Sequence, residues 1–306
     1  MPLSAALPQI STNVRFAASR LLFPELAGAL AERLFLTPPR ARDAAAAALD
    51  LIDARSGIVE HKGRSIVTWT WGARRARAGS DDAPAVLLAH GWGGHAAQMR
   101  AFVFPLLSAG YRVIAYDQPA HGVSEGKLTG LPDFADVLAE VAWHHGGVEG
   151  VIAHSMGGAG AALAIARGLR VGRVVLIGSS LDVSFYSQQF ARWYWIPQRV
   201  LGAMQAAVEE RFGVRWADLD MAQLAPRLAT PALMIHDRGD RLVPWQQGAS
   251  FARGWPGARL FSTQGLGHRR ILGDEQVTAL AAQFIAGRSS IAGLAAPALP
   301  HPSPLY

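Results

Sequence analysis

Six short, mostly apolar runs, separated by stretches of helical length, constrain the fold of this chain more than any other feature. Each run is long enough for one buried strand, and helices are predicted between them, for example at 132–145 and 274–286. A strand that is covered on both faces reads as a continuous apolar run. The pattern therefore predicts an α/β fold with a mostly parallel, twisted sheet and helices on both faces. The six runs lie at residues 85–89, 112–116, 151–153, 174–177, 232–236 and 259–262.

The rest of the chain divides around this alternating core. Residues 58–61 and 65–71 read as an antiparallel strand pair, and 12–36 and 42–54 as helices, the first of them interrupted at Pro24. We expect the first helical segment to dock on the domain. The expected organisation is an N-terminal helical extension at 1–56, an α/β core at 57–180 and 230–288, a small helical lid inserted at 181–229, and a disordered tail at 289–306.

Composition excludes several classes of protein. The 306 residues are 50% hydrophobic and 17% charged, which suits a soluble globular chain with a large core. Without cysteine there is no disulfide framework and no thiol nucleophile. The formal charge is +6, but the arginines are spread along the chain. The densest group, Arg74, Arg75 and Arg77, is not interleaved with aromatic residues, so we expect no nucleic-acid partner. No apolar run approaches the roughly 18–20 residues of a membrane span, so we expect a cytoplasmic protein without integral membrane contact.

One candidate nucleophile, Ser155, lies between a predicted strand and a predicted helix. The apolar run 151–153 precedes it, and the small, helix-compatible stretch 159–166 follows it. Small residues flank it at Ala153 and Gly157, as a sharp strand-to-helix turn requires, because a strained serine brings its backbone close to both. Such a turn exposes the hydroxyl and directs the first N–H groups of the helix toward whatever the serine attacks.

This turn resembles the nucleophile elbow of the α/β-hydrolase superfamily. The family pattern is G-x-S-x-G, here with Ala153 in place of the first glycine, and some bacterial lipases of the superfamily read A-H-S-M-G as this chain does. The segment 90–94, His-Gly-Trp-Gly-Gly, is similar to the family's H-G-x-x-G oxyanion loop. The resemblance implies that the backbone N–H groups of Trp92 and Met156 form an oxyanion hole.

Three further segments are similar to family motifs. Residues 117–124 resemble the D-x-P-G-x-G-x-S segment, which implies a structural role under the site. The triad acid of the family lies in a D-x-x-V-P segment that maps onto Asp240, with Asp237, nearer the strand end, as the competing residue. A histidine between glycines maps onto His268. The resulting order Ser155, Asp240, His268 is the order expected of an α/β hydrolase.

The resemblance covers about residues 57–180 and 230–286 and implies a serine hydrolase that cleaves a carboxylic ester or related acyl bond of a small molecule through an acyl-enzyme, without a cofactor. Members with an aspartate nucleophile are disfavoured because Ser155 holds that position. Several alternatives share the triad: a thioesterase, an acyltransferase, an aminopeptidase or a carbon–carbon-bond hydrolase. A non-catalytic binding protein on the same fold is the alternative from another class.

The predicted lid is rich in aromatic residues. They could fix the lid to the core, touch a membrane, or line an apolar pocket for an acyl or alcohol group. Under the last interpretation the candidate substrate contacts are His154, Trp193, Tyr194 and Trp195. The adjacent His144 and His145 end a predicted helix, and no third ligand is evident beside them, so no metal site is expected.

Overall fold

The computed structural model describes residues 24–40, 44–49, 51, 53–72, 83–179 and 182–288. The predictions for the first part of the helical segment before Pro24, for the arginines at 74–77 and for the tail at 289–306 lie outside these residues. Within the described residues, no helix is both long and apolar enough to cross a membrane.

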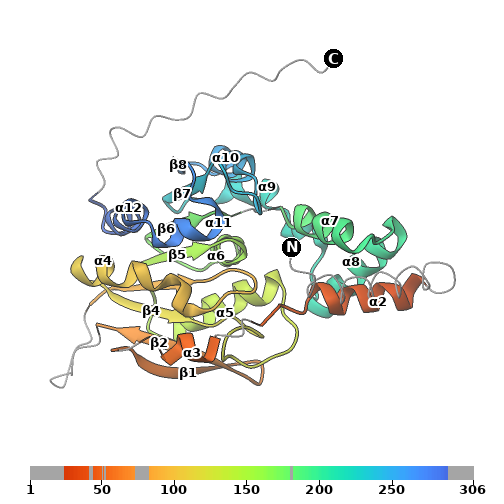
Figure 1. Cartoon of the computed structure of the whole chain (residues 1–306), viewed down its shortest axis with the longest axis horizontal. Helices are drawn as coiled ribbons and strands as arrows, with labels where there is room; N and C mark the ends of the chain where they lie inside the picture. The colour runs from red at the N-terminus through yellow and green to blue at the C-terminus, as the bar shows by residue number, and fades with distance from the viewer. Residues whose placement is uncertain are drawn as a thin grey trace, which may run out of the picture.

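The strands form one eight-stranded sheet in the order β1-β2-β4-β3-β5-β6-β7-β8 (Figure 1). β2 pairs antiparallel with β1 and β4, and all the other neighbours are parallel. The predicted mostly parallel sheet of an α/β fold is therefore confirmed. The strands are β1 Arg55–His61, β2 Arg64–Trp71, β3 Ala85–Ala89, β4 Arg112–Tyr116, β5 Gly150–His154, β6 Arg173–Ile177, β7 Ala232–Asp237 and β8 Arg259–Thr263.

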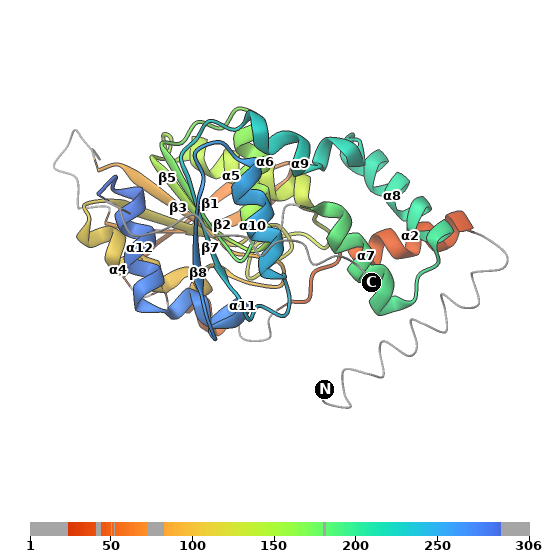
Figure 2. The same ribbon diagram turned by 90° about the horizontal axis from the view of Figure 1, so that it is seen from above.

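Successive residues of each buried strand pack into opposite layers. In β3, Leu87 and Ala89 belong to one core cluster, and Val86 and Leu88 belong to the other. Figure 2 shows α4 and α12 on one side of the sheet and α10 on the other. The first layer contains α5 Leu131–His144, α6 Met156–Ala166 and α10 Trp245–Gly254, and the second contains η2 Ala96–Phe102, α4 Val103–Ser108 and α12 Glu275–Ile285.

The N-terminal part of the sheet differs from the predicted bounds. The first strand begins at Arg55 rather than near 58, because its first residues still find partners: Arg55 pairs with Thr70 and Gly57 with Thr68. The alanine-rich helix is correspondingly shorter, with α3 described as Ala44–Leu49.

The chain between β6 and β7 contains helices and, in its described residues, no strand. Two longer helices, α7 and α8, project beside the sheet, and shorter turns lead back to β7 (Figure 1). These elements are α7 Val183–Tyr194, α8 Gln198–Phe212, η3 Trp216–Leu219, α9 Met221–Leu224 and η4 Ala225–Arg227.

The N-terminal helix α2 (Pro24–Phe35) packs along α8, far from it in sequence (Figure 1). Their backbones approach closely, since a Cβ added at Gly28 would lie 2.5 Å from the Cβ of Ala203. Glu32 of α2 is 4% exposed and forms an ion pair with Arg211 of α8. We call α2, α7 and α8 together the helical cap. The first of these helices, α2, lies in the segment expected to form an N-terminal extension that docks on the domain.

Candidate active site

Ser155 occupies the turn between β5 and α6. Its backbone has φ +54° and ψ −124°, a conformation that residues other than glycine rarely adopt. Its N–H donates to the carbonyl of Ile177 at 2.9 Å, which ties the turn to β6. A Cβ added at Gly157 would lie 2.4 Å from the carbonyl oxygen of His90, and one at Gly91 would lie 2.7 Å from the Cβ of Ser155. Glycine at these two positions lets the loop after β3 lie directly against the serine.

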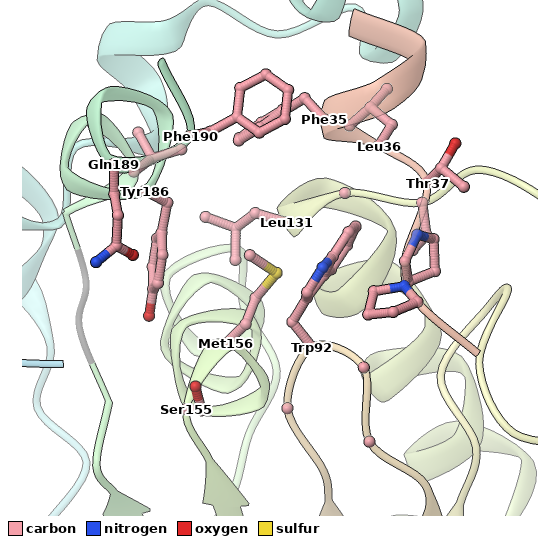
Figure 3. A pocket seen from close by; sticks show the side chains of 18 of the residues that line it. Phe35, Leu36, Thr37, Trp92, Leu131, Ser155, Met156, Tyr186, Gln189 and Phe190 are labelled. Atoms are coloured by element: carbon pink, nitrogen blue, oxygen red, sulfur yellow. The ribbon is translucent and has the colours of Figure 1, made fainter. Parts of the chain in front are cut away.

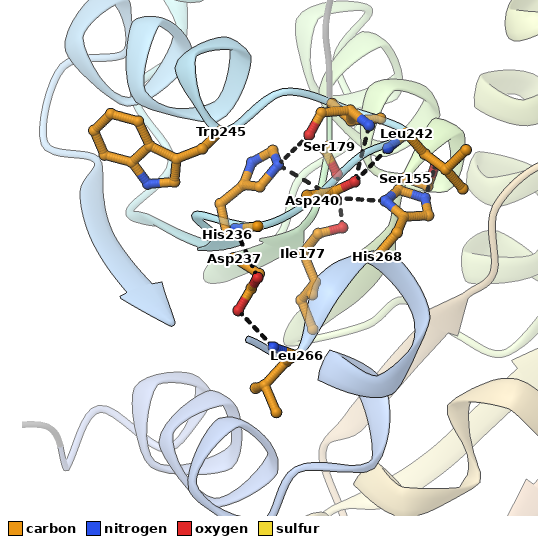
Figure 4. A network of polar contacts seen from close by, with 12 residues as sticks. Ser155, Ile177, Ser179, His236, Asp237, Asp240, Leu242, Trp245, Leu266 and His268 are labelled. Atoms are coloured by element: carbon orange, nitrogen blue, oxygen red, sulfur yellow. Dashed lines mark hydrogen bonds and ion pairs between the residues drawn. The ribbon is translucent and has the colours of Figure 1, made fainter. Parts of the chain in front are cut away.

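The structure brings Ser155, His268 and Asp240 into one hydrogen-bonded chain (Figure 4). The Oγ of Ser155 lies 3.0 Å from Nε2 of His268, and Nδ1 of His268 lies 2.7 Å from Oδ2 of Asp240. Because a carboxylate only accepts, Nδ1 carries the hydrogen and Nε2 offers its lone pair to the serine hydroxyl. This is the tautomer that a histidine needs to act as a general base toward the serine.

The carboxylate of Asp240 is also held by the backbone. Its Oδ1 accepts from the N–H groups of Leu242 at 2.8 Å and Val243 at 2.9 Å. Burial by itself would raise the pKa of Asp240, but hydrogen bonds from His236, His268 and the Val243 N–H outweigh it and hold that pKa well below its usual range. Asp240 is therefore ionised at neutral pH and keeps a fixed orientation toward His268.

Asp237, the competing acid, is bonded to other groups. Its Oδ2 accepts from the hydroxyl of Thr263 at 2.7 Å and from the N–H of Leu266 at 3.0 Å, and its Oδ1 accepts from the N–H of Gly239 at 2.8 Å. Among the described residues it makes no hydrogen bond to His268. Asp237 thus links the loop after β7 to the loop after β8.

His154, a predicted substrate contact, lines the cavity above the serine and also holds the loop of His268. Its Nε2–H donates to the carbonyl of His268 at 2.9 Å, and the two ring centroids are 4.6 Å apart. Burial, together with the neighbouring His268, lowers the pKa of His154 to about 3. The side chain is therefore neutral, and among the described atoms its buried Nδ1 has no partner.

The two predicted oxyanion donors belong to the segments that flank Ser155. Met156 follows it directly, and Trp92 lies close to it on the other segment (Figure 3). Trp92 follows Gly91, whose backbone lies against the serine. In the part of the chain that the structure describes, neither the Trp92 nor the Met156 backbone N–H has a protein acceptor. Both groups are available to an oxygen that develops negative charge beside Ser155.

Two neutral histidines hold the loop after β3. A structural role was expected for the segment 117–124, which contains His121, but its bond to the Gly93 N–H and the role of His90 were not predicted. Nε2 of His121 accepts from the N–H of Gly93 at 2.9 Å, while its Nδ1–H donates to the carbonyl of Pro119 at 2.9 Å. His90 accepts from the N–H of Gln118 through Nε2 at 2.9 Å. Burial lowers the pKa of His121 to about 4 and that of His90 well below its usual value. Each ring therefore keeps the lone pair that holds the loop.

The segment after β4 is fixed by the buried carboxylate of Asp117. Its Oδ1 accepts from the N–H of Ala96 and its Oδ2 from that of Val123, each at 2.7 Å. Ala120, where the family motif has glycine, has φ +63°. Burial raises the pKa of Asp117 to about 6.

A cavity of about 520 Å³ lies between the core and the helical cap. Figure 3 shows Ser155 at one end of it and the rings of Phe35 and Phe190 at the other. Trp92 and Leu131 contribute from the core. Its lining is mostly aromatic and aliphatic, which is typical of sites for small organic ligands.

The structure brings only some of the predicted aromatic contacts to this cavity. Trp193 and Tyr194 line it, whereas Trp195 does not; it is 74% exposed and ends α7 in a left-handed conformation. Residues 34–39, which lie in the predicted N-terminal extension, also line the cavity. The helical spacing of that segment indicated an apolar face but not what the face covers.

No group of three or more His, Cys, Asp or Glu side chains in the described residues is placed to hold a metal ion. The polar groups next to Ser155 are the imidazole of His268, with Asp240 behind it, and the backbone N–H groups of Trp92 and Met156.

Comparison with known proteins identifies the family. A profile of the α/β-hydrolase fold matches residues 84–210. A relative, the magnesium-chelatase 30 kDa subunit of Rhodobacter capsulatus, is 30% identical over 255 residues, covering 68% of this chain and 86% of that protein. The chain belongs to the α/β-hydrolase fold family.

Solved structures agree with this assignment. An esterase of Pyrococcus furiosus resembles this α/β-hydrolase with a TM-score of 0.61 at 20% identity, covering 82% of this chain and 98% of the esterase. An esterase of a Rhodococcus species has a TM-score of 0.54 at 20% identity, covering 78% of this chain and 100% of the other. At these identities the likeness concerns the fold.

Proposed function

We propose that this α/β-hydrolase cleaves carboxylic esters or related acyl bonds through an acyl-enzyme formed on Ser155. The observation that carries the proposal is the continuous chain from Ser155 Oγ through His268 to Asp240, with distances of 3.0 and 2.7 Å, at the end of a mostly apolar cavity. A serine hydroxyl is a weak nucleophile until a neighbouring base removes its proton. In this site the base is already oriented.

Each step of the proposed reaction has a group in place. Ser155 Oγ attacks the carbonyl carbon while its proton passes to Nε2 of His268, and Asp240 stabilises the imidazolium that results. The N–H groups of Trp92 and Met156 bind the oxyanion, and loss of one such donor typically costs roughly 3–4 kcal/mol of transition-state stabilisation. His268 then protonates the leaving group, and water hydrolyses the acyl-enzyme by the same path.

The cavity supports an apolar acyl group as the part of the substrate that is recognised. Its size, about 520 Å³, falls within the range of roughly 300–1,000 Å³ typical of small-molecule sites. Aromatic walls from the cap and the core supply contact area without charge. We therefore expect small or medium apolar acyl esters to be preferred.

A fluorophosphonate probe tests the proposal. The parent enzyme should be labelled on Ser155, and Ser155→Ala should lose both labelling and p-nitrophenyl ester turnover while keeping its melting temperature within a few degrees. The exposed serine of α10 provides the control, since Ser250→Ala should retain both. Substantial ester turnover by Ser155→Ala would show that the nucleophile is elsewhere.

A second candidate is a non-catalytic role in an assembly. It is favoured by one finding, the name of the 30%-identical relative, which describes a subunit of magnesium chelatase. The complete hydrogen-bonded chain at Ser155 supports catalysis instead. Folded parent protein that neither reacts with the probe nor turns over any member of an ester and thioester panel would favour the assembly role.

A further inference from the structure

A second hollow, of about 660 Å³ and more open than the cavity, adjoins the site on the side of His268. It is formed by the loops that follow β7 and β8. Leu242, His268 and Arg269 line both the hollow and the apolar cavity, so the two spaces meet at His268. Two further arginines, Arg241 and Arg270, complete a positively charged wall.

The charge of this wall is not neutralised within the described structure. Arg241, Arg269 and Arg270 are exposed, and in the residues that the structure describes none of them forms an ion pair. The two carboxylates of these loops do not line the hollow. Asp240 is bonded to His268, and Asp237 to Thr263 and backbone N–H groups.

Some other cations of the described residues are engaged. Lys62, Arg64 and Arg211 each pair with a carboxylate. Arg238, on the same loop as Arg241, lies over the ring of Trp245 at 4.5 Å from its centroid. Further arginines of the described residues, such as Arg253 and Arg259, also form no ion pair. What distinguishes Arg241, Arg269 and Arg270 is that all three line one hollow beside His268.

One of these arginines is also held in place. Nε and one terminal nitrogen of Arg270 donate to the carbonyls of Leu266 at 3.1 Å and Gly265 at 2.7 Å. A guanidinium has five N–H donors in a rigid plane, so the remaining donors stay free for an anion. A side chain already fixed in this way loses less conformational freedom when it binds an anion.

We propose that the hollow binds an anionic group, a phosphate or a carboxylate, carried by the leaving group of the acyl substrate. This rests on the proposed acyl transfer to Ser155. In that reaction His268 gives its proton to the departing oxygen or sulfur, so the leaving group must lie next to Nε2 of His268 as its bond to the acyl carbon breaks. The acyl part occupies the apolar cavity, and the leaving group then extends toward the arginines.

Matched substrate pairs test this inference. The phosphate pair is hexanoyl-coenzyme A and the hexanoyl thioester of N-acetylcysteamine, which has the same thioester but no phosphate. The carboxylate pair is the hexanoyl ester of 4-hydroxybenzoate and that of its methyl ester. The readout is the ratio of kcat/KM for the charged member to kcat/KM for the neutral member, in which any change common to both substrates cancels.

We expect at least one ratio in the parent to exceed unity and to fall as salt is added. Arg241→Gln, Arg269→Gln and Arg270→Gln should each lower it, and the best-placed side chain should do so by roughly tenfold, as loss of a charge-assisted hydrogen bond does. Arg253→Gln, an exposed arginine on α10, is the matched control and should keep the parent ratio. Which pair responds identifies the anion.

Ratios near or below unity for both pairs in the parent would overturn the inference. So would ratios that none of the three loop substitutions changes, or that Arg253→Gln lowers equally, since the effect would then be one of overall charge. Turnover of the neutral substrates separates this result from failure of the proposed function, because the neutral substrates need Ser155 but not the arginines.

Discussion

At the scale of single residues, the site depends on which aspartate reaches His268. Asp237, the last residue of β7, and Asp240, in the loop that follows, are three residues apart and both buried. Motif matching favoured Asp240 but left the nearer residue open. The structure gives Asp240 the bond to Nδ1 of His268 and gives Asp237 the bonds between loops.

Asp240→Asn should therefore lower kcat for a p-nitrophenyl ester far more than Asp237→Asn. An amide at position 240 can donate to Nδ1 and hold the wrong histidine tautomer, which costs about 10⁴-fold in a serine protease. Asp237→Asn should act mainly on stability, because it weakens the bonds to Thr263 and Leu266. A larger loss of kcat in Asp237→Asn would mean that the acid has been misassigned.

At the scale of elements, the helical cap supplies one side of the cavity wall and the core supplies the other. α7 supplies aromatic side chains near its end, but only those that face inward can contact a substrate. Trp193 and Tyr194 at the end of this helix line the cavity, although Trp193 is 54% exposed, whereas Trp195, which follows the helix, does not line it.

Trp193→Ala and Tyr194→Ala should change the preference between short and longer acyl chains, because each methylene in such a pocket is worth roughly 1–3 kcal/mol of discrimination. Trp195→Ala is the control and should keep the parent's preference. The measurement is kcat/KM across p-nitrophenyl esters of rising chain length. Unchanged ratios in the first two variants, with only lower stability, would show that these rings fix the cap without selecting the substrate.

The second element that matters is α2, which is joined to α8 through the pair Glu32–Arg211. Glu32→Gln should lower the free energy of unfolding by about 1–3 kcal/mol, because Arg211 is 44% exposed and the pair is only partly buried. The same substitution should shift the preference for acyl chain length, because Phe35 of α2 lines the cavity. Urea unfolding and the same ester series measure the two effects. The exposed Glu25→Gln on α2 is the control, and an equal effect there would contradict a specific role for the pair.

At the scale of the whole molecule, buried neutral histidines make stability depend on pH. The pKa of His121 is about 4 in the folded protein, below its ordinary value of 6.5. Between these pH values the imidazole is protonated in the unfolded chain but not in the folded chain. The contribution of His121 to the free energy of unfolding is therefore fully present above about pH 6.5 and is lost as the pH falls toward 4. Asp117, with its pKa raised to about 6, acts in the opposite direction.

His121→Gln isolates this contribution. Between pH 7 and pH 5 the parent should lose about 2 kcal/mol more unfolding free energy than the variant, because glutamine can still accept from the Gly93 N–H but does not titrate. Urea unfolding at the two pH values measures it, with exposed His144→Gln as the control. Equal losses in the parent and His121→Gln would contradict the assignment.

Much of the fold and some of the site could be read from the sequence. Runs such as 85–89 are buried on both faces, and a strand buried in this way consists almost entirely of apolar residues, which the sequence shows directly. The serine turn was visible because its sterics demand small neighbours at 153 and 157. The positions of α2 and of His121 were not predictable, because an apolar helical face or a buried histidine does not specify its partner. Those partners depend on long-range packing.

The pairing of α2 with α8 also has a consequence for how the protein is made. A ribosome adds about 5–20 residues each second, and α8 ends roughly 180 residues after α2 does. For something like ten to thirty seconds, the small apolar face of α2 that includes Ala27 and Ala31 exists without the helix that covers it. The first described helix of the chain is thus among the last to find its place, and a nascent chain must keep it from other contacts until then.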